Sequence, residues 1–233
     1  MEKMIKPLIR SYSHPRWPED RDKLRRIQES LRKRIRLSPL EKEPKFVAGV
    51  DAAFFGDKVI SAACVFTYPG LEFVEQSYLV KEVSFPYIPG YLSFREGPAI
   101  IEALEGLKTR PDVVIFDGQG IAHPRGVGIA SYVGVLLEIP TVGCAKSRLI
   151  GDYTEPGTRK GSRRALRHEG RVVGAVLRTR DGKRPVFVSP GHMIDIPGSL
   201  EVVLNSTGRF RLTEPVRCAD ILSKRIKRSL EGR

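Results

Sequence analysis

Apolar residues recur in a strand-like pattern from residue 46 onward. Three segments are rich in β-branched and aromatic residues, at 46–55, 59–68 and 73–83. Gly-Asp and Pro-Gly turn signals separate each segment from the next. The pattern predicts three consecutive antiparallel strands.

The pattern then changes to an alternation of helices and strands. Residues 93–110 predict a helix with Ser93 as its N-cap. Residues 113–116 are all apolar, which is typical of a central strand buried on both faces. A helix at 129–139 and a short strand at 141–145 follow. This succession predicts an α/β fold with a mixed sheet.

The last part of the chain predicts a hairpin and two helices. The hairpin spans 171–192 and turns around Asp181 and Gly182. The helices are expected at 199–207 and 219–230.

The segment at 21–36 is an amphipathic and strongly basic helix. Eight basic residues occupy the positions around an apolar stripe formed by Leu24, Ile27, Leu31 and Ile35. Two interpretations stay open for this helix. It can be an arm that contacts phosphates, or a packing helix whose charged face is merely solvated.

The charge balance of the whole chain favours a polyanionic partner. Forty Lys and Arg against 27 Asp and Glu give a formal net charge of +13, and the sequence pI is about 9.9. Such an excess attracts nucleic acid and releases its counterions on binding. The alternative is that the charge serves solubility alone.

Composition also indicates the cellular setting. The three cysteines are far apart and odd in number, which argues against a disulfide framework or a zinc ribbon. No signal-peptide core and no apolar run of membrane-spanning length occurs in the sequence. We expect a cytoplasmic protein without a membrane partner, and a monomer by default.

Three acidic residues occupy positions at which a functional role would explain an acid. Asp51 interrupts an apolar strand, where an acid is costly to bury unless a partner or a metal compensates it. Asp117 ends the predicted central strand, the place where open α/β sheets put their ligand sites. Glu96 lies near the start of a helix, which also makes ordinary capping a possible explanation for it. Together they suggest a carboxylate site.

Carboxylates without clustered histidine or cysteine suit Mg²⁺ or Mn²⁺. Phosphodiester cleavage needs such an ion to activate water and to stabilise the departing oxygen. Zinc fits less well because the histidines are dispersed, at His14, His123, His168 and His192. The glycines of GVGIAS lie too far from their strand for a dinucleotide turn, and no P-loop sequence occurs.

Several motifs occur together and in order along the chain. They are VAGVD, FPYIPGYLSFREGP, DGQGIAHPRGVGIASYVGV and VGCAKS. In this combination the sequence resembles the endonuclease V family over residues 46–220. The resemblance implies an RNase H-like fold, in which a mixed sheet is flanked by helices. It also divides the single domain of 1–233 into a basic helical extension (1–45), a catalytic core (46–220) and a C-terminal basic helix (221–233).

The resemblance implies a role for each matching acid. Asp51, Glu96 and Asp117 would bind the metal, with Asp51 and Asp117 on adjacent strands. Asp220 matches a position that holds Asp or His in different family members, and plain helix capping is its alternative. Mg²⁺ is the expected ion, with Mn²⁺ able to substitute.

Two further residues are implied as catalytic. His123 matches the family's active-site histidine, where it could position water or bind a phosphate, or be a structural loop residue. Lys146 matches an active-site lysine that would neutralise charge on the scissile phosphate. Its alternative is a surface cation at a strand end.

The resemblance also implies substrate-binding residues. Tyr87 matches an aromatic wedge that enters the duplex at the lesion, with a buried loop tyrosine as the alternative. The extruded hypoxanthine would occupy a pocket of mainly backbone groups, formed by Gly90, Leu92, Gly118, Gly128 and Ile129.

The implied reaction is hydrolysis of the second phosphodiester bond on the 3′ side of deoxyinosine. It leaves a 3′-hydroxyl and a 5′-phosphate and removes no base. Cleavage of inosine-containing RNA is an alternative that the sequence leaves open. A non-catalytic binding module is a second alternative, although such a module has no need of acids buried near phosphates.

Overall fold

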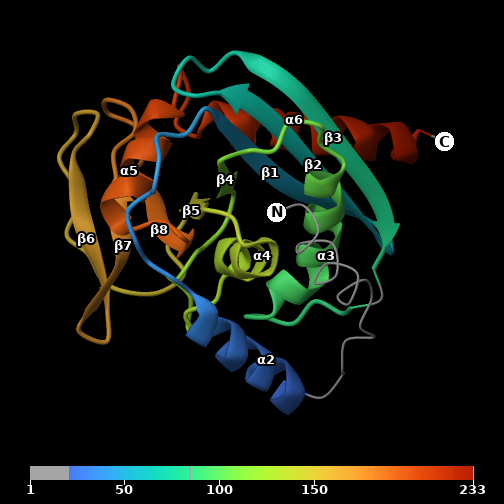
Figure 1. The fold of residues 1–233 in the computed structure, drawn as a ribbon, viewed down its shortest axis with the longest axis horizontal. Helices are drawn as coiled ribbons and strands as arrows, with labels where there is room; N and C mark the ends of the chain where they lie inside the picture. Colours follow the sequence, from blue (N-terminus) through green and yellow to red (C-terminus); the bar gives the residue numbers. More distant parts are fainter. Residues whose placement is uncertain (1–20, 84, 233) are drawn as a thin grey trace.

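The computed structural model describes residues 21–83 and 85–232, and within them one mixed sheet forms the centre of the molecule (Figure 1). Its eight strands lie in the order β3-β2-β1-β4-β5-β8-β7-β6. β1 is parallel to β4 and β4 is parallel to β5, whereas the other neighbours are antiparallel. The strands are β1 (Phe46–Phe55), β2 (Lys58–Thr67), β3 (Phe73–Glu82), β4 (Val113–Phe116), β5 (Thr141–Ala145), β6 (Arg163–His168), β7 (Arg171–Leu177) and β8 (Val186–His192).

The predicted mixed α/β sheet is confirmed. β1, β2 and β3 form the expected antiparallel meander, and β7 and β8 form the expected hairpin. β6 was not predicted, because its sequence RRALRH carries four basic residues and only one buried position. β6 is an edge strand, where charged side chains also protect the sheet from pairing with another chain.

Helices cover both faces of the sheet (Figure 1). One apolar core lies under α3 and α4 and includes alternate residues of β4 such as Val114 and Phe116. The other core lies under α5 and α6 and includes Val113 and Ile115. β4 is therefore buried on both faces, as predicted. The helices are α2 (Arg21–Arg34), α3 (Leu92–Glu105), α4 (Ile129–Leu137), α5 (Ile196–Asn205) and α6 (Glu214–Glu231).

Three helices begin earlier than their sequences indicated. The prediction of Ser93 as an N-cap is wrong, because α3 begins at Leu92 and Ser93 is buried inside it. α5 begins at Ile196, where the carboxylate of Asp195 accepts from the Gly198 N–H at 2.8 Å. α6 begins at Glu214, so the expected boundary at residue 221 falls within a continuous helix.

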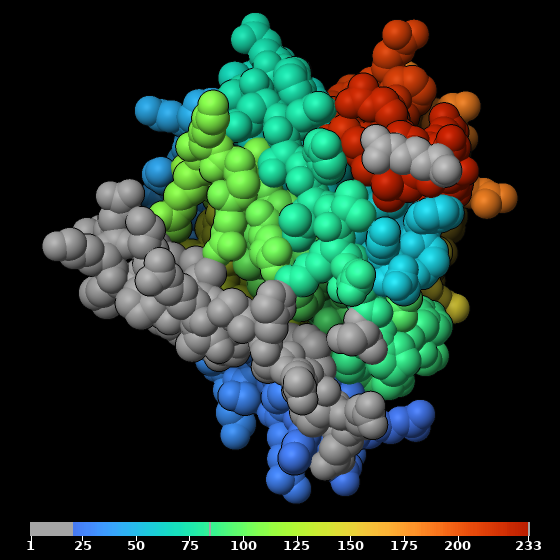
Figure 2. Space-filling model, turned by 90° about the vertical axis from the view of Figure 1, so that its right-hand side faces the viewer, coloured from blue at the N-terminus to red at the C-terminus, as the bar shows by residue number. Residues whose placement is uncertain are grey.

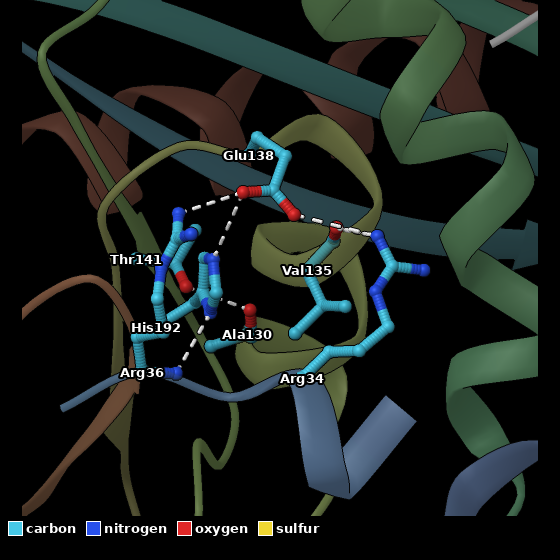
Figure 3. Close-up of polar contacts among 7 residues, drawn as sticks. All are labelled: Arg34, Arg36, Ala130, Val135, Glu138, Thr141 and His192. Carbon is cyan, nitrogen blue, oxygen red and sulfur yellow. Dashed lines mark hydrogen bonds and ion pairs between the residues drawn. The ribbon is translucent and has the colours of Figure 1, made fainter. Parts of the chain in front are cut away.

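The basic helix α2 is fixed to the core at its C-terminal end (Figure 3). Glu138, which ends α4 in a left-handed conformation, forms ion pairs with Arg34 at 3.3 Å and Arg36 at 2.7 Å. The Arg36 N–H donates to Nδ1 of His192 at 3.3 Å. Burial and the Arg36 charge lower the pKa of His192 against the opposing effect of Glu138, so its imidazole is neutral near pH 7.

The two basic helices α2 and α6 lie far apart. In the side view, the blue α2 is at the lower end of the molecule and the red α6 is at the upper right (Figure 2). α2 packs beside α4, whereas α6 packs along β1 and β2. They therefore reach the site described below from different sides.

Two expectations from composition can be compared with the structure. Cys64 and Cys144 are buried and Cys218 is partly buried, and all three are free, as expected for apolar fillers. Over the described part of the chain, no helix combines the length and apolarity needed to cross a bilayer.

Candidate functional site

A pocket of about 540 Å³ opens beside the middle of β1 and at the carboxyl ends of β4 and β5. Eleven of the twelve predicted site residues line it, and Asp220 is the exception. The eleven come from β1, from α3, from the start of α4 and from the loops that follow β3, β4 and β5: Asp51, Tyr87, Gly90, Leu92, Glu96, Asp117, Gly118, His123, Gly128, Ile129 and Lys146. The fold thus gathers residues that are far apart in the sequence.

Strand register places the first group of side chains. Val50 of β1 is opposite Phe116 of the parallel strand β4. Asp51 and Asp117 are the next residues along the two strands, so they lie side by side. Lys146 directly follows β5, the next strand, and its ammonium group donates to a carboxylate oxygen of Asp117. Two acids and one cation therefore lie close together on three neighbouring strands, with Asp51 within β1 and the other two directly after β4 and β5.

Helix α6 supplies the next contact. A Cβ at Gly49 would lie 2.1 Å from the Pro215 carbonyl carbon, so the absence of a side chain there lets α6 lie directly on β1. The hydroxyl of Ser223, which is fully buried, donates to Oδ2 of Asp51 at 2.7 Å. Asp220 forms an ion pair with Lys224 at 2.7 Å. Ser223 was missed in the sequence, although it falls within a predicted helix, on the face that the structure buries.

The carboxylates disturb one another's ionisation. Burial raises the pKa of Asp51 to about 6; the Ser223 hydrogen bond opposes this rise, and the charges of Asp220 and Asp117 add to it. Burial raises the pKa of Glu96 to about 8, and the negative charges of Asp51 and Asp117 contribute. Both pKa values are therefore raised mainly by burial, and the mutual repulsion of the acids adds to the shifts.

This donor set has the chemistry of a site for a hard divalent cation. Oxygen ligands on carboxylates are those that Mg²⁺ and Mn²⁺ prefer, and a cation would relieve the mutual repulsion of the acids. Among residues 21–83 and 85–232, no three acidic, histidine or cysteine side chains converge as a ready-made metal site. Asp117 is instead paired with Lys146, which would exchange partners when a cation binds.

His123 lies in the wall of the pocket and is 7% exposed. Its Nδ1 accepts from the Arg125 backbone N–H at 3.2 Å, so the neutral ring carries its proton on Nε2. Burial and the Arg125 charge lower the pKa of His123 to about 4, and a hydrogen bond to the Gly90 backbone opposes them. Both ring nitrogens are therefore engaged with the loops, and the imidazole is neutral near pH 7.

Tyr87 is the most exposed large apolar side chain at the pocket, with 68% of its surface accessible. This exposure rules out the alternative of a buried loop tyrosine. An exposed aromatic ring beside a pocket is available for contact with a partner. Its loop continues to Gly90 and Leu92, which line the same pocket.

The opposite wall is formed by two loops rich in backbone groups. Gly118 follows β4, and Gly128 and Ile129 begin α4. The Gln119 side chain, which was not among the predicted site residues, donates to the Ser147 carbonyl at 3.1 Å and joins the loops after β4 and β5. Gln119 is nearly buried, so this bridge fixes the two loops relative to each other.

A mixed sheet flanked by helices, with one acid within β1 and another directly after the adjacent parallel strand β4, defines an RNase H-like protein. The chain belongs to the endonuclease V family, since the family model described as Endonuclease V matches residues 29–221. It is therefore a nuclease. Nucleases of this family generally use a divalent metal.

Three relatives illustrate the similarity. Endonuclease V of Geotalea uraniireducens is 51% identical over 91% of this chain and 90% of its own length. The crystal structure of endonuclease V from Streptomyces avermitilis has a TM-score of 0.88 and 39% identity, over 92% of this chain and 96% of its own. Ciona intestinalis endonuclease V has a TM-score of 0.78 and 25% identity over 90% and 98%. That structure holds a 24mer DNA with an inosine followed by a ribo-adenosine.

Proposed function

We propose that this chain is a DNA repair endonuclease that acts on deoxyinosine and other deaminated bases. It hydrolyses the second phosphodiester bond on the 3′ side of the lesion and leaves a 3′-hydroxyl and a 5′-phosphate. The observation that carries the proposal is a single pocket that joins a carboxylate cluster to a backbone-lined cavity beside an exposed tyrosine. The inosine in the DNA bound by the Ciona relative supports the choice of lesion.

Recognition is assigned to the loops. Tyr87 enters the base stack and offsets the energy needed to extrude the lesion. Gly90, Leu92, Gly118, Gly128 and Ile129 then hold the extruded base. Inosine presents a carbonyl and a ring N–H, so backbone donors and acceptors can select it over adenosine.

Hydrolysis is assigned to the strand ends. Asp51, Glu96 and Asp117, with Asp220 near, would hold a Mg²⁺ or Mn²⁺ ion, which would supply activation of water and stabilisation of the departing oxygen. Lys146 leaves Asp117 and neutralises charge on the scissile phosphate. Ser223 fixes the carboxylate of Asp51. His123 is neutral and held by the loops, so its contribution is to position the two loops around the substrate.

Cleavage of inosine-containing RNA is a second candidate. The DNA in the Ciona complex carries a ribo-adenosine directly after the inosine, so the relative accommodates a 2′-hydroxyl at that position. A monomeric nuclease with either sugar preference is compatible with the pocket described above.

The test is metal-dependent nicking of matched end-labelled substrates. One duplex carries a single deoxyinosine, a second is unmodified, and a single-stranded RNA carries one inosine. We expect a Mg²⁺-dependent nick one nucleotide beyond the deoxyinosine and no nick in the unmodified duplex. Cleavage confined to RNA would show that the protein is an inosine-specific ribonuclease and not a DNA repair enzyme. Tight binding of the inosine duplex without cleavage of any substrate would show a binding module.

A further inference from the structure

A buried polar side chain of α2 reaches the rim of the pocket. Gln28 is 0% exposed, although its buried neighbours on the helix, Leu24 and Leu31, are apolar. Its Nε2 donates to the Gly90 carbonyl at 3.1 Å, and its Oε1 accepts from Nε of Arg125. Both ends of the amide are engaged, and any other arrangement would leave buried polar atoms without partners.

The Gly90 carbonyl is the centre of this network. Nη2 of Arg125 donates to the same oxygen, while its guanidinium lies 4.3 Å from the centroid of the Tyr91 ring. The Tyr91 N–H donates to the Ile88 carbonyl at 3.0 Å. The peptide group between Gly90 and Tyr91 is thus held at its oxygen and at its nitrogen.

Close packing makes this arrangement specific. Gly90 has a φ of +80°, and a Cβ there would lie 2.5 Å from Nη2 of Arg125. His123 also hydrogen-bonds to the Gly90 backbone. The network therefore joins α2 to the loop that carries Tyr87 and to the loop that carries His123 and leads to Gly128. Both loops line the pocket.

α2 is suited to hold these loops because its other end is fixed. Arg34 donates to the Val135 carbonyl at 3.3 Å and pairs with Glu138, as Figure 3 shows. Leu24 and Leu31 pack into the core under α3 and α4. The helix is therefore attached to the body of the protein on both sides of Gln28.

We infer that Gln28 is a positioning residue that preforms the lesion pocket from outside the sheet, acting through Gly90 and Arg125. The inference rests on the proposed function, because it assigns the pocket to an extruded base. Without the Gln28 amide, the loop at 85–91 becomes ordered only when substrate binds, and that ordering opposes binding. Hydrolysis at the strand ends does not depend on this amide.

The first experiment compares Gln28→Met with Glu29→Met, a control at the next, exposed position of the same helix. Half-saturating concentration and kcat are measured on the inosine duplex. For Gln28→Met we expect the half-saturating concentration to rise about tenfold, the factor given by loss of one good hydrogen bond. The value of kcat should stay within about twofold, and the control should match wild type.

The second experiment reads the loop without any substrate. Amide hydrogen exchange of residues 85–92 is followed in the free proteins, and thermal unfolding confirms that each variant is folded. Gln28→Met should exchange faster in this segment than Glu29→Met, while β1 and β4 keep their protection. A double variant with Arg125→Met should show non-additive effects, because both side chains act on one carbonyl.

The outcomes separate the inference from the proposed function. If wild type does not prefer inosine, the proposed function fails, and the exchange experiment still tests whether Gln28 orders the loop. If wild type prefers inosine and Gln28→Met changes only the melting temperature, Gln28 is structural and the inference is wrong. A fall in kcat with unchanged half-saturation would overturn it as well.

Discussion

The two basic helices α2 and α6 are alike in sequence character and differ in what they touch. Each has an apolar stripe, a charged outer face and one small or medium polar residue on its buried side. The polar residue of α6 is Ser223, which donates to the carboxylate of Asp51. That of α2 is Gln28, which donates to the backbone of Gly90. One helix therefore supports the acids and the other supports the loops.

This difference shows that hydrolysis and recognition have separate supports in the fold. α6 packs along β1 and β2 and reaches the site through the sheet. α2 packs beside α4 and reaches the site through the loops after β3 and β4. Substitutions that act through one helix should therefore leave the contribution of the other unchanged.

The largest effect is expected at the strand ends, for Asp117→Ala. This change removes an acid proposed to bind the metal and the partner of Lys146. We expect kcat for nicking to fall by about 10³-fold or more, with affinity for the inosine duplex retained. Single-turnover nicking and gel-shift titration measure the two quantities. Full activity of this variant would exclude the metal mechanism as proposed.

The next effect concerns α6 itself, through Ser223→Ala. Loss of the hydroxyl frees Oδ2 of Asp51. Residues that orient a metal ligand typically contribute about 10–100-fold to metal affinity or activity. We expect the Mg²⁺ concentration for half-maximal nicking to rise by about tenfold, with preference for inosine over the unmodified duplex unchanged. If the preference fell as well, the two supports would not be separate.

A smaller effect is expected on stability, from Glu96→Gln. The pKa of Glu96 is raised to about 8 from an ordinary value of 4.5, so its contribution to stability is complete below pH 4.5 and lost as the pH rises through 8. With a chelator at pH 8.5, the Gln variant should melt about 2–4 °C above wild type. The difference should vanish near pH 4.5 in differential scanning fluorimetry. A variant less stable than wild type at pH 8.5 would contradict the raised pKa.

The smallest effect is expected from the outer face of α2, by Lys23→Gln and Arg26→Gln together. Both side chains are exposed, so the change tests whether this face binds phosphates. If it does, the slope of log affinity against log salt should decrease by about 1 for each phosphate that is no longer neutralised, with kcat unchanged. An unchanged slope would leave α2 only its packing and positioning roles.

Pattern in the sequence predicts most of the fold and leaves part of the site hidden. β-branched and aromatic content with turn signals locates β1 to β3, and the apolar run locates β4, because such segments are typical of strands in a buried sheet. Gln28 and Ser223 were not identified, since a polar residue on a buried helical face reveals its partner only in three dimensions. The helical spacing of Gln28 was nevertheless a signal in the sequence, because this residue lies between Leu24 and Leu31 on the buried face of the helix. The roles assigned to the twelve site residues remain predictions.

The attachment of α2 through a short apolar stripe, one buried amide and a few ion pairs also bears on fidelity. Local opening of a helix on the outside of the fold requires less free energy than unfolding of a central sheet. Mild heating or denaturant should therefore release the Gly90 clamp while the acids of β1 and β4 keep their arrangement. Under these conditions the enzyme would still hydrolyse phosphodiester bonds, but its preference for inosine over unmodified DNA would fall. Selectivity would therefore be lost before kcat.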